Sequence, residues 1–340
     1  MLAYGLGIGT KNEKNEWLEV FYPAPVWQPE PGDEVALGSV LSTPFNEALE
    51  LTPPLLQKFA QALSATGNDT QAAIASSLQT SKRPVVLCRI AEDKAPSSTP
   101  EAYLKLHLIS HRLVKPHGLS LEGIFGLLPN VAWTSAGAID LEELPARQLV
   151  ARAADTNLEV FSVDKFPKMT NYVVPSGVRI ADTARVRLGA YVGEGTTIMH
   201  EGFINFNAGS EGKSMIEGRI SAGVVVGEGS DLGGGCSTMG TLSGGGNIVI
   251  SIGKNSLVGA NAGVGIPLGD RCIIEAGLYI TSGTKVAILD GSGTTVKQLK
   301  ARELANQNDL VFRRNSISGQ VEVVTNKTVV ELNEALHANN

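Results

Sequence analysis

Aliphatic residues recur every six positions between Val174 and Val286, and this period constrains the fold more than any other feature of the chain. In the first stretch the recurring positions are Val174, Ile180, Val186, Val192, Ile198 and Ile204. A small or compact residue follows four positions after each of them. A hexapeptide repeat is typical of a parallel β-helix, in which the aliphatic side chains point inward and the small residues lie near the corners. Short strands of a β-sandwich are the alternative, which the many matches to one template disfavour.

The period is interrupted at Asn205–Met215 and at Thr238–Asn247. We expect both segments to be loops that leave the repeat, and such loops often carry function. After Val286 the period stops. Beyond it we expect a short helix over Val296–Ala305, a β-hairpin over Leu310–Val324 and a terminal helix over Thr328–Ala338.

Composition excludes several classes of protein. The net charge of -6 does not favour nucleic acid or an anionic membrane as partner. The three cysteines, Cys88, Cys236 and Cys272, have no metal-ligand spacing and indicate buried thiols in a reducing compartment. The N-terminus does not resemble a signal peptide, and no apolar run approaches transmembrane length. We therefore expect a cytoplasmic protein.

Residues 1–170 form a separate α/β region in this interpretation. The expected strands are Ala3–Thr10, Glu19–Tyr22 and Val85–Ile90. We expect helical structure over 45–63, broken into two helices at Pro53-Pro54. Two more helices are expected, one from Thr99 through Leu113 and one over Leu141–Ala154. His107 and His111 have the spacing of metal ligands on a helix, but without a third ligand nearby we expect packing or surface histidines.

Three long runs carry a resemblance to a known family. They are Met199–Gly209, Met215–Gly235 and Gly259–Val286, and the closing run Leu310–Val324 adds to them. The hexapeptide pattern resembles the left-handed β-helix acyltransferases, which are typically trimers that bind an acyl-CoA. The runs resemble the long form of the tetrahydrodipicolinate N-succinyltransferases. This resemblance implies an N-terminal α/β domain at 1–170, a left-handed β-helix with the acyl-CoA site at 171–288, and a C-terminal segment at 289–340.

The resemblance implies an acyl transfer in diaminopimelate and lysine biosynthesis. The succinyl group of succinyl-CoA would pass to the amine of ring-opened tetrahydrodipicolinate, giving N-succinyl-2-amino-6-oxopimelate and CoA. We expect these two small molecules as substrates, a homotrimer with no nucleic-acid or membrane partner, and no tightly bound cofactor. Flat β-helix faces stack well against copies of themselves, and closed symmetry is the usual form of soluble oligomers.

Glu217 is the predicted catalytic residue, at the position of the family's glutamate. It either forms an acyl-anhydride, as the family's glutamate is described to do, or acts as a general base on the amine. Arg219 is predicted to bind the succinyl carboxylate, because a guanidinium matches a carboxylate at two points. The other predicted substrate and acyl-CoA contacts are Gly234, Ser237, Ala260, Glu275, Ala276, Gly283, Lys300, Arg313, Arg314, Asn315 and Ser316. The alternative for the two adjacent arginines is a charged edge strand.

Two further residues and two other functions remain in consideration. His200 is a rival general base, and transfer to an amino sugar or amino acid is the rival reaction. A non-catalytic β-helix scaffold is the alternative outside enzymes. Glu201 corresponds to a magnesium-binding position of some relatives, but Ala184 stands where the partner aspartate is expected, so magnesium is doubtful.

Overall fold

The computed structural model describes residues 1–240 and 248–325 of the 340-residue chain. The chain divides into two compact units. The N-terminal unit comprises Met1–Val114, Gly118–Pro167 and Asn171–Val173. The β-helix unit comprises Lys115–His117, Lys168–Thr170 and Val174–Asn340. Within the described residues, no helix has both the length and the apolar character needed to cross a membrane.

An antiparallel sheet forms the centre of the N-terminal unit. Its strands are β1 (Ala3–Lys11), β2 (Trp17–Phe21), β3 (Val26–Trp27), β4 (Glu47–Glu50) and β5 (Val85–Ile90). They pair in the order β2-β1-β5-β4, with β3 also on β1. Alternation along β1 divides its side chains between two faces. Tyr4 and Leu6 point toward one layer of helices, while Gly5 leaves room for the ring of Tyr22 and for Leu104 on the other.

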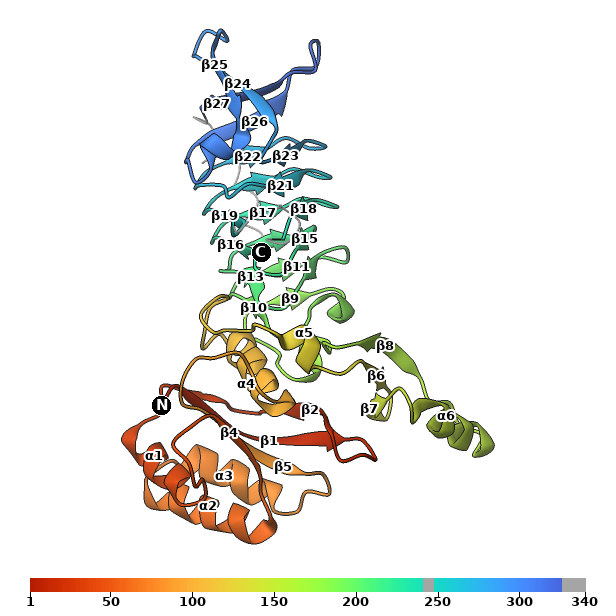
Figure 1. Cartoon of the computed structure of the whole chain (residues 1–340). Coiled ribbons are helices and arrows are strands. Elements are labelled where there is room, and N and C mark those ends of the chain that lie inside the picture. The colour runs from red at the N-terminus through yellow and green to blue at the C-terminus, as the bar shows by residue number, and fades with distance from the viewer. Residues whose placement is uncertain (241–247, 326–340) are drawn as a thin grey trace. The chain divides into compact units, whose positions relative to one another are not determined.

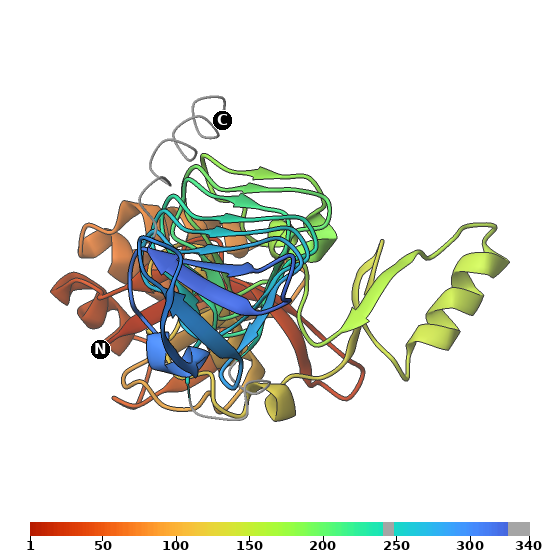
Figure 2. The same cartoon turned by 90° about the horizontal axis from the view of Figure 1, so that it is seen from above.

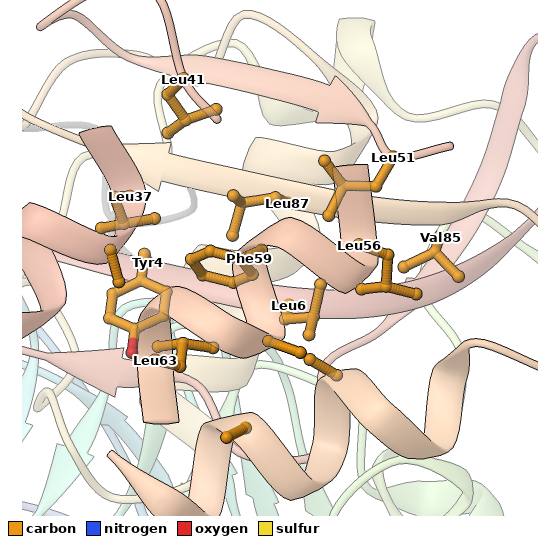
Figure 3. Close-up of a cluster of buried hydrophobic side chains, with 14 residues drawn as sticks. Tyr4, Leu6, Leu37, Leu41, Leu51, Leu56, Phe59, Leu63, Val85 and Leu87 are labelled. Carbon is orange, nitrogen blue, oxygen red and sulfur yellow. The ribbon is translucent and has the colours of Figure 1, made fainter. Parts of the chain in front are cut away.

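Helices cover both faces of this sheet (Figure 1). They are α1 (Pro31–Gly38), α2 (Pro53–Ala65) and α3 (Asp69–Leu78) on one face, and α4 (Thr99–Ser110) on the other. Leu56, Phe59 and Leu63 of α2 pack with Tyr4 and Leu6 into one apolar cluster (Figure 3). Every residue of α4 from Pro100 to Ser110 is buried, as expected of a helix that is apolar on most sides.

His107 is a packing residue of α4, as predicted. Its Nε2 accepts a hydrogen bond from the backbone N–H of Tyr22 at 3.2 Å, and its Nδ1 lies 2.8 Å from the carbonyl oxygen of Tyr103. Burial lowers the pKa of His107 to about 3, so the ring is neutral at ordinary pH. Among the residues that the structure describes, no group of three or more His, Cys, Asp or Glu could hold a metal ion.

A second, three-stranded sheet completes the N-terminal unit. Its elements are α5 (Ile124–Leu127), β6 (Val131–Thr134), β7 (Gly137–Asp140), α6 (Leu144–Ala153) and β8 (Val160–Asp164). The antiparallel strands pair in the order β7-β6-β8, and α6 connects β7 to β8. Figure 2 shows α6 extending away from the first sheet of this unit.

The β-helix unit consists of coils whose short strands align into three parallel sheets (Figures 1 and 2). One sheet pairs β10-β13-β16-β19, a second pairs β12-β15-β18-β21-β23, and a third contains β9, β11, β14, β17, β20 and β22. Their bounds are β9 (Arg179–Ile180), β10 (Ala190–Val192), β11 (Thr197–Ile198), β12 (Phe203–Ile204), β13 (Ala208–Ser210), β14 (Met215–Ile216), β15 (Arg219–Ile220), β16 (Val225–Val226), β17 (Asp231–Leu232), β18 (Ser237–Thr238), β19 (Ser251–Ile252), β20 (Leu257–Val258), β21 (Gly263–Gly265), β22 (Ile273–Ile274) and β23 (Tyr279–Thr281). A short 3-10 helix, η1 (Met169–Asn171), precedes β9, and a second one, η2 (Thr183–Arg185), lies between β9 and β10.

Aliphatic side chains align inside the coil as the six-residue period predicts. Ile198, Ile216, Leu232, Val258 and Ile274 follow one another in register on successive strands of the third sheet, and all are buried. The prediction of a parallel β-helix is confirmed.

A small cap of mixed parallel and antiparallel strands follows the last coil. Its elements are β24 (Lys285–Leu289), β25 (Thr295–Lys300), η3 (Ala301–Leu304), β26 (Leu310–Arg314) and β27 (Val321–Thr325). Strand β26 pairs with β22 and places the buried Phe312 beside Ile274. The cap therefore covers the open edge of the third sheet, as repeat folds require at their ends.

Three sequence-based predictions are wrong. Residues 47–50 form strand β4 and not a helix, because they pair with the buried strand β5, and this pairing overrides helical propensity. Thr295–Lys300 is likewise a strand, paired with β24, and only Ala301–Leu304 is helical, as a 3-10 turn. Asn205–Met215 does not leave the coil, since β13 pairs in register with β10 and β16.

The hairpin predicted at Leu310–Val324 is present as β26 and β27. The predicted helix Thr328–Ala338 lies outside the described residues, as does most of the interruption at Thr238–Asn247.

Candidate active site

Glu217 lies in an unusually short corner of the β-helix. Two residues, Glu217 and Gly218, join β14 to β15, whereas four residues join β17 to β18 in the next coil. This shortening explains why the six-residue period, which is in phase from Ile198 to Ile216, resumes only four residues later at Ile220. The backbone N–H of Glu217 donates to the Leu232 carbonyl at 2.8 Å, which fixes the corner on the coil below.

The carboxylate of Glu217 is partly exposed and lies over Gly234. A Cβ atom built on Gly234 would lie 3.5 Å from Glu217 Oε2, and among the described residues it would meet no other neighbour within 4 Å. Glycine at this position therefore keeps the space beside the carboxylate open. The role of Gly234 as a point of close approach for a ligand stays a prediction.

Arg219 follows on the outer face of β15, where it is exposed. Its backbone N–H donates to the Cys236 carbonyl at 2.9 Å, and it pairs in register with Ser237. Cys236 lies directly beneath Gly218, the residue between Glu217 and Arg219 in the chain. Burial raises the pKa of the Cys236 thiol to about 12, with Arg219 opposing and Glu217 adding to the shift. Both charged groups are thus close to Cys236, while the thiol itself stays protonated.

The corner that contains Glu217 continues as a row along successive coils. Gly234 accepts a hydrogen bond from Asn261 at 2.9 Å, and Ala260 accepts one from Gly277 at 2.8 Å through their carbonyls. In the last coil the Glu275 carboxylate accepts a hydrogen bond from the Arg314 backbone at 2.6 Å. We call this row the corner row, and its predicted site residues are Glu217, Gly234, Ala260, Glu275, Ala276 and Arg314.

Other predicted residues lie elsewhere. Ala276 precedes strand β23, whereas Gly283 follows it. Lys300 also lies beyond the far end of β23, because it pairs with Lys285. Strand β23 thus separates Gly283 from Ala276, at opposite ends of one strand of the last coil. The role of Gly283 as an acyl-CoA contact stays a prediction.

The hairpin residues have structural partners. The Arg313 guanidinium pairs with the Glu322 carboxylate at 3.1 Å, and the Asn315 amide donates to the same carboxylate at 2.8 Å. The Asn315 side chain also accepts hydrogen bonds from the backbone of the turn, where Ser316 is exposed. Arg314 is exposed and donates to the Gly319 carbonyl at 3.2 Å. The two arginines therefore have different surroundings.

His200 and Glu201 lie exposed in the corner between β11 and β12. The Arg185 guanidinium donates to the Glu201 carbonyl at 2.9 Å and to the Gly202 carbonyl at 3.1 Å, which holds this corner through its backbone.

Sequence reasoning missed Tyr279, which is 52% exposed on the outer face of β23. Its ring lies against Gly263 of β21, where even a Cβ atom would overlap it. The sequence signal for this contact was the pair Gly263 and Gly265. These two glycines lie on the outer face of β21 and leave that face without side chains of its own.

A parallel β-helix of hexapeptide coils is the fold of the hexapeptide-repeat proteins, a class that includes acyltransferases. Family models support this class. Models described as the N-terminal and middle parts of tetrahydrodipicolinate N-succinyltransferase match residues 45–126 and 128–168. A model described as the hexapeptide repeat of succinyl-transferase matches residues 249–282.

Whole-chain relatives give the family. Proteins named 2,3,4,5-tetrahydropyridine-2,6-dicarboxylate N-succinyltransferase are 64% identical in Pseudomonas aeruginosa, over 100% of this chain and 99% of that protein, and 58% identical in Vibrio cholerae, over 99% of each. A solved Campylobacter jejuni structure, named as a candidate 2,3,4,5-tetrahydropyridine-2-carboxylate N-succinyltransferase, has a TM-score of 0.88 and 33% identity, over 96% of this chain and 93% of that one. The chain belongs to the tetrahydrodipicolinate N-succinyltransferases. The predictions of this family and of its left-handed β-helix are confirmed.

Proposed function

We propose that this chain transfers the succinyl group of succinyl-CoA to the amine of ring-opened tetrahydrodipicolinate. The products are N-succinyl-2-amino-6-oxopimelate and free CoA. The two-residue corner is the observation that most directly supports a role for Glu217 and Arg219 in this reaction. It holds these two residues on either side of Gly218. A reacting thioester over Gly234 would have the carboxylate beside it and a guanidinium within reach of its distal end.

In the direct mechanism, the amine nitrogen bonds to the thioester carbonyl carbon and the bond from carbon to sulfur breaks. CoA leaves as a thiolate. Glu217 accepts the proton that the amine loses, and this proton then neutralises the thiolate. Arg219 holds the succinyl carboxylate in a two-point contact, which orients the carbonyl toward the amine.

In the covalent mechanism, the Glu217 carboxylate attacks the thioester carbonyl first. An anhydride forms and the CoA thiolate leaves before the amine reacts. The amine then bonds to the succinyl carbonyl carbon, the bond from that carbon to the Glu217 oxygen breaks, and the carboxylate is regenerated. The proton that the amine loses passes to water, and a proton from water neutralises the thiolate. The two mechanisms differ in one observable, because only the covalent one releases a thiol equivalent without the acceptor.

The corner row offers a path for the donor away from Glu217. We propose that Gly234, Ser237, Ala260 and Ala276 contact the acyl-CoA through backbone groups and the Ser237 hydroxyl. Glu275 positions the Arg314 backbone at the end of this row. Gly283 as a contact of the pantetheine arm stays a prediction, and so does Glu201 as a magnesium ligand. The predicted contacts of the CoA phosphates also stay predictions: Lys300, Arg313, Arg314, Asn315 and Ser316.

We propose a homotrimer in the cytoplasm, with the acyl-CoA site in residues 171–288. The outer face of the third sheet supports an assembly, because Leu257, Ile273 and Val311 align there in register and each is only partly buried. The three cysteines are free and buried, which fits a reducing compartment. Light scattering on a sizing column measures the assembly, and a monomer would contradict the proposal.

Thiol release tests the proposed reaction. Purified protein is mixed with succinyl-CoA or acetyl-CoA, with and without tetrahydrodipicolinate. We expect continuous release only with succinyl-CoA and the acceptor together. A burst of one thiol per chain without acceptor would select the covalent mechanism. No release with either donor would contradict the proposed function.

A further inference from the structure

The outer face of β21 is covered by side chains from its two neighbours. A Cβ atom on Gly263 would overlap the Tyr279 ring and lie 2.7 Å from its Cγ. A Cβ atom on Gly265 would lie 2.7 Å from Met239 Sδ. Tyr279 comes from the following coil and Met239 from the preceding one. We call this apolar surface, made by Met239 and Tyr279 over the two glycines, the platform.

The platform lies in the same parallel sheet as Arg219, the proposed ligand of the succinyl carboxylate. Arg219, Ser237, Gly263 and Tyr279 pair in register on successive strands of one parallel sheet. Neighbouring strands lie about 4.8 Å apart, so three steps separate Arg219 from Tyr279 by roughly 14 Å. An extended arm that starts at a thioester near Glu217 therefore passes the platform before it reaches the cap.

The position of Tyr279 on its own strand points to the same path. Tyr279 begins β23, directly after the corner with Glu275 and Ala276, and the turn with Gly283 follows the end of that strand. The ring is 52% exposed, although it packs against the glycine beneath it. A tyrosine that presents one apolar face at a ligand site is a common anchor.

We propose that the platform, and Tyr279 above all, is the seat of the branched dimethyl portion of the pantetheine arm of the donor. This inference rests on the proposed function and adds a specificity-determining residue to it. Arg219 then holds the carboxylate end of the donor, and Tyr279 holds the apolar middle of its arm. A side chain from a second copy of the chain is the competing occupant of the platform.

The test compares two donors and two variants. Succinyl-CoA carries the dimethyl group, whereas S-succinyl-N-acetylcysteamine ends before it. In Tyr279→Ala we expect kcat/KM for succinyl-CoA to fall about tenfold, mainly through KM, since a pair of buried methyl groups contributes on this order. For the truncated donor we expect no change. Tyr279→Phe keeps the ring and should retain wild-type values with both donors.

Gly263→Ala provides an independent perturbation, because it displaces the ring without altering it. Its backbone is not in the left-handed region, so the overlap with Tyr279 is the main cost. We expect the same selective loss for succinyl-CoA, and no further loss when Gly263→Ala is added to Tyr279→Ala.

Two results would overturn the inference. One is an equal loss with both donors, which would make Tyr279 a purely structural residue. The other is a change in oligomeric size on the sizing column, which would assign the platform to a second copy. If the wild-type protein releases no thiol with either donor, the proposed function fails instead. Calorimetric titration with CoA then tests the platform alone, and Tyr279→Ala should weaken the Kd for CoA about tenfold.

Discussion

Alanine at Gly218 should misplace both Glu217 and Arg219, because the corner has no room for a side chain. A Cβ atom there would overlap Cys236 Sγ, and it would lie 2.7 Å from the Cys236 carbonyl oxygen and 3.1 Å from the Gly233 carbonyl oxygen. Two of these three neighbours are backbone atoms, which cannot rotate away. The corner must therefore lift off the coil beneath it.

The size of the effect follows from the packing. Inserting a methyl group into a filled site costs about 1–3 kcal/mol, which lowers the Tm by several degrees. A displacement of about 1 Å at the reacting groups reduces turnover by about a hundredfold. We expect Gly218→Ala to show both losses, measured by thermal unfolding and by thiol release from succinyl-CoA with tetrahydrodipicolinate.

Gly291→Ala is the matched control. Gly291 is exposed, and a Cβ atom there meets no atom of the described part of the chain within 4 Å. This variant should keep the wild-type Tm and turnover. A Gly218→Ala protein that also keeps both would refute the packing described for the corner.

Three further predictions concern charge and burial. Arg219→Ala should raise the KM for succinyl-CoA far more than that for acetyl-CoA, since acetyl has no carboxylate; equal effects would count against carboxylate binding. The pKa of His107 is lowered from 6.5 in the unfolded chain to about 3 by burial, so the unfolded state gains a proton first as the pH falls and stability is lost between these values. In His107→Gln, unfolding should depend less steeply on pH over that window, and an unchanged slope in urea titrations would contradict this assignment. The buried thiols of Cys88, Cys236 and Cys272 should not react with an aromatic disulfide reagent until the protein unfolds; labelling of the native protein within minutes would contradict their burial.

The sequence predicts the β-helix because its core depends on a local rule. One aliphatic residue in six fills the interior, so Ile198, Ile216 and Leu232 can be assigned inward without knowing any other part of the structure. The two-residue corner at Glu217 is visible in the sequence as a four-residue step from Ile216 to Ile220, whereas the predicted loop at Asn205–Met215 precedes this step. The step is the sign of a shortened corner, and it occurs at the residue that the family resemblance identifies.

Features that depend on pairing between distant segments were not predictable in the same way. Residues 47–50 become a strand because of β5, almost forty residues later. Val296 and its neighbours become a strand because the turn at Asp290, whose carboxylate accepts hydrogen bonds from Ser292 and Thr294, folds them back on β24. Tyr279 was missed because its contact with Gly263 joins two coils, and nothing in either residue alone indicates it.

The central claim is that Glu217 performs the succinyl transfer. Thiol release from succinyl-CoA with tetrahydrodipicolinate, measured for Glu217→Ala beside the wild-type protein, tests it most directly. The account predicts that Glu217→Ala folds and assembles like the wild type but does not turn over, while His200→Ala in the neighbouring exposed corner stays active. A fully active Glu217→Ala protein, or loss of activity in His200→Ala alone, would contradict the account and favour a histidine base.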